Sequence, residues 1–420
     1  MSSNKKTVLK GFDYMHCDDF AKYLEDMAAK GWHFKEWGAG LKFEKGEPEQ
    51  ATYAVEVFTK ASENDMRPEP QTEEFAEYCE VAGWKLVDAK QKFCIFKKVR
   101  EDAVALFTPK ERVENAFKGA VSGTAVMLLV LYGVNALLQW INIISFFEDY
   151  IFASSFLYSF AVWHVMFFGQ LAMFVYAFVK KHKMLREIDA GKEIYIGIGK
   201  DNKFHIHMRD VYVGLLMLLL LVYLGMSGRP EQVWMNLFVV VVTFVFCAVL
   251  AKIRPSNSTN VIVQIVFSLV LIMTIVITSM AIVGDSRENL TRQEEVPLYL
   301  TDYRESFGVV EDISVHERAN LLGSSAYYFI FGEGNAIHYD IYQSKYDWIL
   351  DKIWEEVLEK KVNVDTIDCT DNWEAKVAFR NKVGNYYVRY KNQIFILHED
   401  ETIILTEEQI SIIREKMDLR

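Results

Sequence analysis

The chain has 420 residues, enough for about two or three domains, and its mean hydropathy of +0.05 hides a strong segregation of apolar and charged sequence. Apolar blocks fill the stretch from Gly119 to Gly284, and mixed charged sequence flanks it on both sides. The formal net charge of −11 belongs to the region Asp285–Arg420, which holds 27 acidic and 16 basic residues. This charge argues against nucleic acid and anionic lipid as partners of that region.

The first 118 residues contain an internal repeat, in which a helix ends at a glycine and a tryptophan opens a hairpin. Three pairs of segments match: 20–23 with 75–78, Gly31-Trp32 with Gly83-Trp84, and the alternating strands 41–45 with 93–97. With strands at 7–14 and 51–59, the predicted order is β-α-β-β-β-α-β-β. This order resembles a ferredoxin-like tandem repeat, so residues 1–118 are expected to form an α+β domain that ends in a juxtamembrane helix.

The N-terminal domain carries 19 basic and 22 acidic residues, which leaves no excess of positive charge to bind nucleic acid. Its sequence shows no nucleotide-binding loop and no catalytic set, so we expect it to bind a cytosolic protein. Trp37 is a candidate for the partner surface. The paired residues Trp32 and Trp84 are interpreted as equivalent core anchors, with a ligand groove as the alternative.

Five apolar segments are long enough, or nearly so, to cross the roughly 30 Å of hydrocarbon in a bilayer. They span about Ala120–Ile144, Ala153–Val179, Val211–Met226, Val233–Leu250 and Val261–Val283. Backbone amides within hydrocarbon must be paired internally, which favours helices. The sequence therefore predicts a five-helix all-α transmembrane bundle within residues 119–284.

The loops between these segments differ in charge. Lysine and arginine precede the first segment and occupy the loops after the second and the fourth, among them Arg112, Lys180 and Arg254. The loop after the first segment carries Glu148 and Asp149 instead. Because basic loops stay in the cytoplasm, we expect a cytoplasmic N-terminus and an extracytoplasmic C-terminus in a multi-pass protein.

His164 is the ionisable residue that lies well inside a predicted span. Together with Gln139, Gln170 and Asn236 it forms a candidate intramembrane polar site. No Asp, Glu, Lys or Arg lies inside any of the five segments. We therefore favour hydrogen bonding between helices over a transport path.

The repeated unit of helix, Gly-Trp and hairpin, the basic junction and the helices behind it resemble an uncharacterised family of bacterial membrane proteins. That family is known by a domain-of-unknown-function label, and its members are often encoded beside PadR-type regulators. The resemblance is best over the N-terminal domain and transfers no catalytic residue. It implies a bacterial plasma membrane, a regulatory role and a cytosolic partner such as a PadR-type regulator.

Residues 285–420 again show an α+β pattern. The expected strands and helices are 326–331, 336–342, a helix at 345–361, 374–380, 386–390, 393–398, and a final helix at 407–418 capped by Thr406. The aromatic segment 385–390 contains Tyr387 and Tyr390, which are candidates for a partner surface or for core packing.

The sequence shows no Ser/His/Asp set, no pair of catalytic carboxylates and no metal-binding pattern. Its five cysteines are scattered and none belongs to a CxxC pair. We therefore expect no cofactor, no metal and no enzymatic activity. The favoured function is that of a membrane sensor or regulator which couples the extracytoplasmic domain to a cytosolic protein. The alternative is a transport or immunity component, such as an accessory permease subunit.

Overall fold

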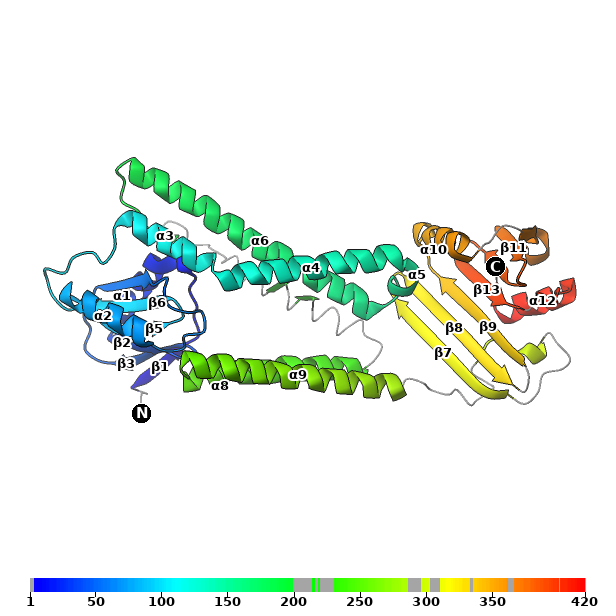
Figure 1. Cartoon of the computed structure of the whole chain (residues 1–420), viewed down its shortest axis with the longest axis horizontal. Helices are drawn as coiled ribbons and strands as arrows, with labels where there is room; N and C mark the ends of the chain where they lie inside the picture. Colours follow the sequence, from blue (N-terminus) through cyan, green and yellow to red (C-terminus); the bar gives the residue numbers. More distant parts are fainter. Residues whose placement is uncertain are drawn as a thin grey trace. The chain divides into compact units, whose positions relative to one another are not determined.

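The computed structural model describes residues 4–198, 214–215, 218–219, 230–285, 296–302, 310–332, 335–361, 366–399 and 401–419 (Figure 1). The chain forms two compact units. The first consists of Met1–Ala136, Val162–Leu218 and Arg229–Thr274, and the second of Leu137–Ala161, Leu219–Gly228 and Ile275–Arg420.

The N-terminal part of the first unit consists of two copies of a strand–helix–strand–strand motif. The first copy contains β1 (Lys5–Val8), η1 (Tyr14–His16), α1 (Cys17–Ala28), β2 (Trp32–Trp37) and β3 (Leu41–Lys45). The second contains β4 (Tyr53–Val57), α2 (Pro70–Val81), β5 (Trp84–Lys90) and β6 (Phe93–Lys98). The predicted order of strands and helices is therefore confirmed. Each copy forms its own antiparallel sheet, in the orders β1-β3-β2 and β4-β6-β5. The last strand of each copy pairs with both of its sister strands, so the domain has two sheets rather than the single sheet of a ferredoxin-like fold.

The two copies match in local detail. Gly31 and Gly83 both have positive φ angles, +77° and +88°, which glycine adopts at little cost where a helix ends. The register of the following hairpin shifts between Phe34 and Glu36 in one copy, and between Leu86 and Asp88 in the other. A shift of this kind marks a β-bulge, which turns the side chain beyond it in a new direction. Glu36 and Asp88 therefore occupy equivalent positions.

The paired tryptophans differ in depth. Trp84 is 9% exposed, and its indole Nε1 donates a hydrogen bond to the carbonyl of Val104 at 2.7 Å. Trp32 is half-buried, and the Nζ atom of Lys6 lies 5.5 Å from the centre of its ring. Trp84 is thus buried in the core, whereas Trp32 packs against the core of the first copy and stays partly exposed.

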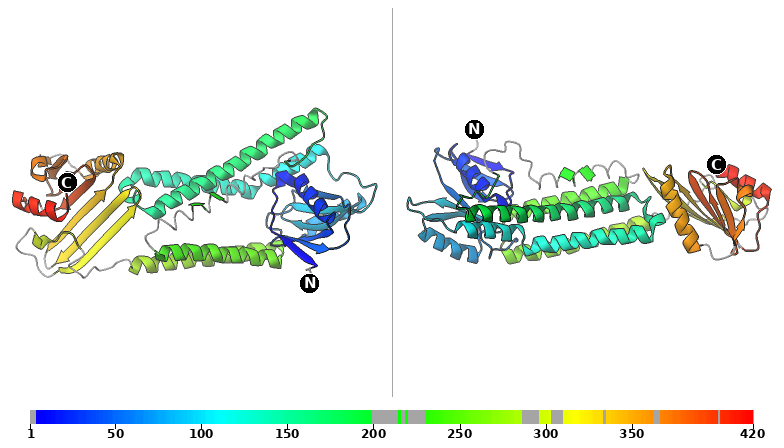
Figure 2. Two further views of the ribbon diagram at one scale, coloured as in Figure 1. Left: turned by 180° about the vertical axis from the view of Figure 1, so that it is seen from behind. Right: turned by 90° about the horizontal axis from the view of Figure 1, so that it is seen from above.

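Six helices lie between the repeat and the C-terminal domain among the described residues. They are α3 (Pro109–Ala120), α4 (Gly123–Ser145), α5 (Phe147–Tyr150), α6 (Ser154–Asp189) and α8 (Pro230–Ile253), and α9 (Asn257–Asp285) follows α8. Thr108 caps α3 in a capping box with Glu111. The helices α8 and α9 run side by side (Figure 2), and the rings of Phe246 and Phe267 stack with centroids 3.7 Å apart.

Two helical stretches, Pro109–Ser145 and Ser154–Asp189, are long and apolar enough to cross a membrane. Only 11% and 6% of their most apolar windows are buried, unlike the core helix of a soluble protein. They indicate an association with a membrane. The helices α8 and α9 cover the predicted fourth and fifth spans. The predicted third span, Val211–Met226, falls outside the described residues except at 214–215 and 218–219. The five-helix bundle therefore stays a prediction.

The C-terminal domain is built on a seven-stranded antiparallel sheet, in the order β10-β11-β12-β13-β9-β8-β7. Its elements are η3 (Leu300–Asp302), β7 (Val310–Asn320), β8 (Gly323–Gly332), β9 (Asn335–Gln343), α10 (Asp347–Lys361), β10 (Thr366–Asp368), α11 (Thr370–Trp373), β11 (Val377–Asn381), β12 (Tyr386–Arg389), β13 (Gln393–His398) and α12 (Glu407–Lys416). The predicted strands and helices are all present, and Thr406 caps α12 as expected. Strand β7 was not predicted, because charged residues interrupt its apolar alternation.

Both faces of this sheet are covered. Side chains of α12 and α11 pack on one face around Tyr339 and Phe395. Side chains of α10 pack on the other face around Tyr342 and Ile394. The central strands therefore have buried residues on both sides, and all four residues of β12 are buried.

We expect Trp84→Ala to lower the stability of the N-terminal domain by about 3–5 kcal/mol, because it removes a large buried ring and its hydrogen bond. Trp32→Ala should cost less, since its ring is half exposed. Resistance of the domain to protease in a denaturant series, in the detergent-solubilised full chain, measures both. Tyr78→Ala is the control, because Tyr78 is 68% exposed. Equal losses for Trp84→Ala and Tyr78→Ala would contradict the assignment.

Candidate functional site

Arg254 lies in the turn between α8 and α9 and reaches into the N-terminal domain. Its φ angle of +52° is one that residues other than glycine rarely adopt. Its Nη2 donates to Asp88 Oδ1 at 2.7 Å, its Nη1 lies 3.4 Å from Glu36 Oε2, and its Nε donates to the carbonyl of Met66 at 2.6 Å. Since Glu36 and Asp88 are equivalent positions of the two repeat copies, one guanidinium connects both copies to the helices.

The ion pair between Arg254 and Asp88 is buried. The two side chains are 13% and 4% exposed, and the other oxygen of Asp88 accepts a hydrogen bond from the backbone N–H of Trp37 at 2.6 Å. Burial raises the pKa of Asp88, and the charge and hydrogen bond of Arg254 oppose that effect without cancelling it. Asp88 therefore depends on Arg254 to remain a carboxylate inside the domain.

The start of α9 contacts the linker between the repeat copies. The backbone N–H of Asn257 donates to Glu69 at 2.9 Å, and its side chain donates to Asp65. The side-chain amide of Asn260 donates to the carbonyl of Asn64 at 2.7 Å. The linker 61–71 is thereby fixed to a helix, and its polar groups accept hydrogen bonds from within the chain.

A second charged cluster fixes the other side of the domain. Arg112 on α3 donates through Nε to Glu56 at 2.8 Å and through Nη2 to Asp18 at 2.7 Å. The second oxygen of Asp18 accepts from the backbone N–H of Ile196 at 2.6 Å. Asp18 lies in the first turn of α1, and Ile196 follows α6 in sequence. The domain is thus attached to α3, to the segment after α6, and to the α8–α9 turn.

A cavity of about 530 Å³ lies between these attachments, in the first unit. Its walls come from the loop before α1, the linker, the first turns of α4, and the helices α6 and α9. Its polar side chains are Asp13, Tyr14, His16, Glu63, Asn64, Gln91, Ser122, Thr124, Gln170, Tyr176, Asn260 and Gln264, and apolar ones such as Phe12, Phe93, Leu128 and Met173 face it as well. This volume and mixture suit a small amphiphilic ligand.

Hydrogen bonds organise the polar wall of the cavity. His16 Nδ1 lies 2.5 Å from Asp13 Oδ2, and its Nε2 lies 3.2 Å from the hydroxyl of Tyr176. Lys180 donates to the carbonyl of Met15 at 2.7 Å. Burial alone would raise the pKa of Asp13, but the hydrogen bond and charge of His16 outweigh it, so this pKa is lowered. The wall thus holds a carboxylate and several donors at fixed positions, where a polar head group can bind.

The structure places one of the four predicted intramembrane residues at this cavity, namely Gln170. His164 is half-buried on α6, with its ring 6.4 Å from that of Phe168. Gln139 is half-buried on α4 and belongs to the second unit, and the side chain of Asn236 on α8 lies outside the described residues. A shared intramembrane site of these residues therefore stays a prediction.

The expected partner surface needs a correction in the C-terminal domain. Tyr387 and Tyr390 are 1% and 2% exposed, because strand β12 is covered on both faces. The hydroxyl of Tyr390 donates to the carbonyl of Trp373 at 2.7 Å, so both tyrosines are core residues. Trp37 is half-buried, and its ring packs edge-on against Phe20 with centroids 5.2 Å apart.

The residues of the Arg254 cluster were not recognised in the sequence. Arg254 counted only as one basic residue of a loop, and Glu36 and Asp88 were not singled out. A usable signal exists in the sequence, because Glu36 follows Trp32 by the same number of residues as Asp88 follows Trp84. Two acids at matching positions of a repeat indicate a shared basic partner.

We expect Arg254→Met to destabilise the N-terminal domain by about 3–5 kcal/mol, because it leaves Asp88 buried without a cation. The pKa of Asp88 in the folded domain is raised, so the folded state holds this proton more tightly than the unfolded state does. The variant should therefore lose stability as the pH rises from 5 to 8, measured by protease resistance. Adding Asp88→Asn should restore most of the loss. An equal loss at both pH values, without rescue, would contradict a buried ion pair.

Comparison with known proteins identifies a family model that matches part of the chain. A family model described as "protein of unknown function (DUF2812)" matches residues 17–130, which cover α1 to the first turns of α4. No curated protein and no solved structure matches the chain. The match supports the prediction of an uncharacterised N-terminal domain, and it spans the repeat together with the junction to the helices.

Proposed function

We propose that this chain is a multi-pass protein of the bacterial plasma membrane that acts as a sensor or regulator. Its N-terminal domain lies in the cytoplasm and binds a cytosolic protein, such as a PadR-type regulator. Five helices cross the membrane, and the domain 285–420 lies outside, where it responds to a condition of the envelope. No covalent chemistry is needed for this role.

The observation that carries this proposal is the insertion of Arg254 between the two repeat copies. A movement of the α8–α9 turn must either carry Glu36 and Asp88 with it or break a buried ion pair. Breaking such a pair costs about 3–5 kcal/mol, as much as a typical allosteric coupling free energy or more. A displacement of the helices is therefore transmitted to the domain rather than lost in a flexible loop.

The orientation is supported by the same residues. Lysine and arginine in loops keep those loops in the cytoplasm. Arg112 and Arg254 belong to these basic segments, and both form ion pairs with acids of the N-terminal domain. The residues that favour the cytoplasmic side are thus the ones that hold the domain, which supports the proposal that the domain lies on the same side as these loops.

The protein partner is supported by the charge and the surface of the domain. With 19 basic and 22 acidic residues, the domain has no excess of positive charge to attract the phosphates of nucleic acid. On α2, Tyr78 and Val81 are 68% and 78% exposed, so apolar side chains face solvent. Exposed apolar residues of this kind are available to another protein.

The topology predicts a difference in labelling with a membrane-impermeant thiol reagent. In a background without Cys247 and Cys369, Val383→Cys should react in intact cells and Tyr78→Cys should react only after the cells are opened. Both positions are exposed within their own domains, at 64% and 68%. The side of the membrane on which each domain lies therefore decides whether its cysteine is labelled. Labelling of the Tyr78 position from outside would overturn the orientation.

The regulator function predicts that the full chain, purified from membranes, retains a cytosolic protein. Arg254→Met should change the amount retained several-fold, because the domain is no longer fixed to the helices. Lys97→Met is the control, since the ion pair of Lys97 with Glu49 is exposed and includes none of Arg254, Glu36 and Asp88. If both variants retain as much partner as wild type, the proposed coupling between the α8–α9 turn and partner binding is wrong. If no protein is retained and the chain instead moves a solute across vesicles, the transport alternative replaces the proposal.

A further inference from the structure

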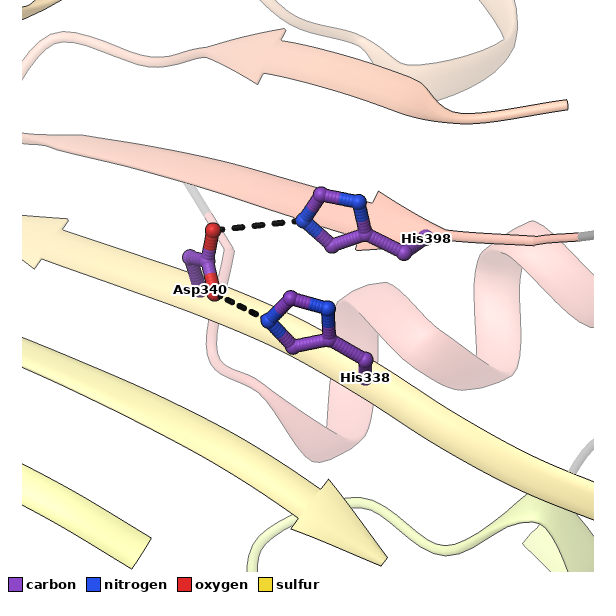
Figure 3. Close-up of side chains that lie close together, drawn as sticks. All are labelled: His338, Asp340 and His398. Carbon is purple, nitrogen blue, oxygen red and sulfur yellow. Dashed lines mark hydrogen bonds and ion pairs between the residues drawn. The ribbon is translucent and has the colours of Figure 1, made fainter. Parts of the chain in front are cut away.

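Three side chains of the C-terminal domain converge on one face of the sheet. They come from two strands, β9 and β13, that are far apart in sequence. His338 and Asp340 are two residues apart on β9, so their side chains lie on the same face. His398 is the last residue of β13 and stands directly opposite His338 in the antiparallel pairing. Figure 3 shows both imidazole rings turned toward the carboxylate of Asp340.

The distances within this cluster are short. His338 Nε2 lies 2.8 Å from Asp340 Oδ1, and His398 Nε2 lies 3.2 Å from Asp340 Oδ2 (Figure 3). The two rings are parallel within 5°, with centroids 3.9 Å apart, and Phe329 stacks on the other side of His338 at 3.8 Å. The three ligand atoms lie within 4.8 Å of one another. Atoms that bind one zinc ion at about 2.0–2.2 Å must themselves lie about 3–4 Å apart. Because the rings are parallel, both must turn toward each other before their Nε2 atoms point at one ion.

We propose that His338, Asp340 and His398 bind a divalent transition-metal ion of the zinc class. Two imidazole nitrogens and one carboxylate oxygen suit such ions and leave one or more coordination positions for water or another ligand. The proposal rests on this geometry and is independent of the proposed regulatory function.

Burial and charge favour a cation at this place. Asp340 is 2% exposed, whereas the side chains of His338 and His398 are 26% and 22% exposed, so an ion can enter from the histidine side. Burial alone would raise the pKa of Asp340, but hydrogen bonds from both histidines outweigh it and lower this pKa to about 2. The carboxylate is therefore already ionised, and the surplus of acidic residues in 285–420 attracts cations toward it.

The other interpretation is that both histidines only donate hydrogen bonds to a buried carboxylate. In that state each Nε2 carries a proton. Metal binding requires the proton to leave Nε2 or to move to Nδ1, and the rings must turn from Asp340 toward the ion, so the two states differ in tautomer and in ring orientation. A metal titration distinguishes them.

The test uses the full chain in detergent, purified without a histidine tag and treated with a chelator. Titration with Co²⁺, followed by its visible absorption, should show one site that disappears in the double variant His338→Ala/His398→Ala. Zn²⁺ should displace the Co²⁺ and raise the melting temperature of wild type, because it binds the folded state. Loss of either ligand should weaken binding by at least about 100-fold, since outer-shell partners alone cost about 10–100-fold.

His316→Ala is the control, because His316 is an exposed histidine on β7 of the same sheet. It should bind Co²⁺ like wild type. His398→Gln keeps a hydrogen-bonding group for Asp340 and so separates metal loss from misfolding; it should melt like the metal-free wild type and show no response to Zn²⁺. Equal Co²⁺ binding by wild type and the double variant, or no binding by wild type at micromolar concentrations, would overturn the proposal.

Discussion

The first unit depends on the burial of one guanidinium between two carboxylates. Each repeat copy places an acid just beyond a β-bulge, and Arg254 reaches both acids from outside the repeat. Glu36 also pairs with Lys42 of its own copy at 2.5 Å, whereas Asp88 is buried against Arg254. The copies pair their strands separately, so the backbone does not join them into one sheet. A charge contributed from outside the repeat therefore connects the two copies to each other and to the helices at one point.

The two copies have similar backbones but different neighbours. Asp18 in the first turn of α1 binds Arg112 and Ile196, whereas α2 begins at a proline and exposes most of its surface. Both copies are attached to the helices through acids, Asp18 and Glu36 of the first and Glu56 and Asp88 of the second, but only α1 takes part through its first turn. The helix of the second copy instead leaves Tyr78 and Val81 exposed. A duplicated unit has acquired two different surfaces while the positions that define the fold stayed matched.

The repeat could be predicted from the sequence because its signals are local. Gly31-Trp32 and Gly83-Trp84 report a helix end and a strand start within a few residues. The histidine cluster could not be predicted, because β9 and β13 are separated by two helices and three strands, and 58 residues separate Asp340 from His398. For Tyr387 and Tyr390 the sequence left a partner surface and core packing open, because it does not show that β12 is a central strand covered on both sides.

The long separation of Arg254 from Asp88, 166 residues along the chain, has a consequence for biosynthesis. The ribosome completes both repeat copies before it makes α8, so the newly made domain contains a buried acid and no Arg254 to neutralise it. The domain reaches its final stability only when the α8–α9 turn has been delivered to it. The stability of the N-terminal domain thus depends on whether the later helices have been made and have brought their turn to it.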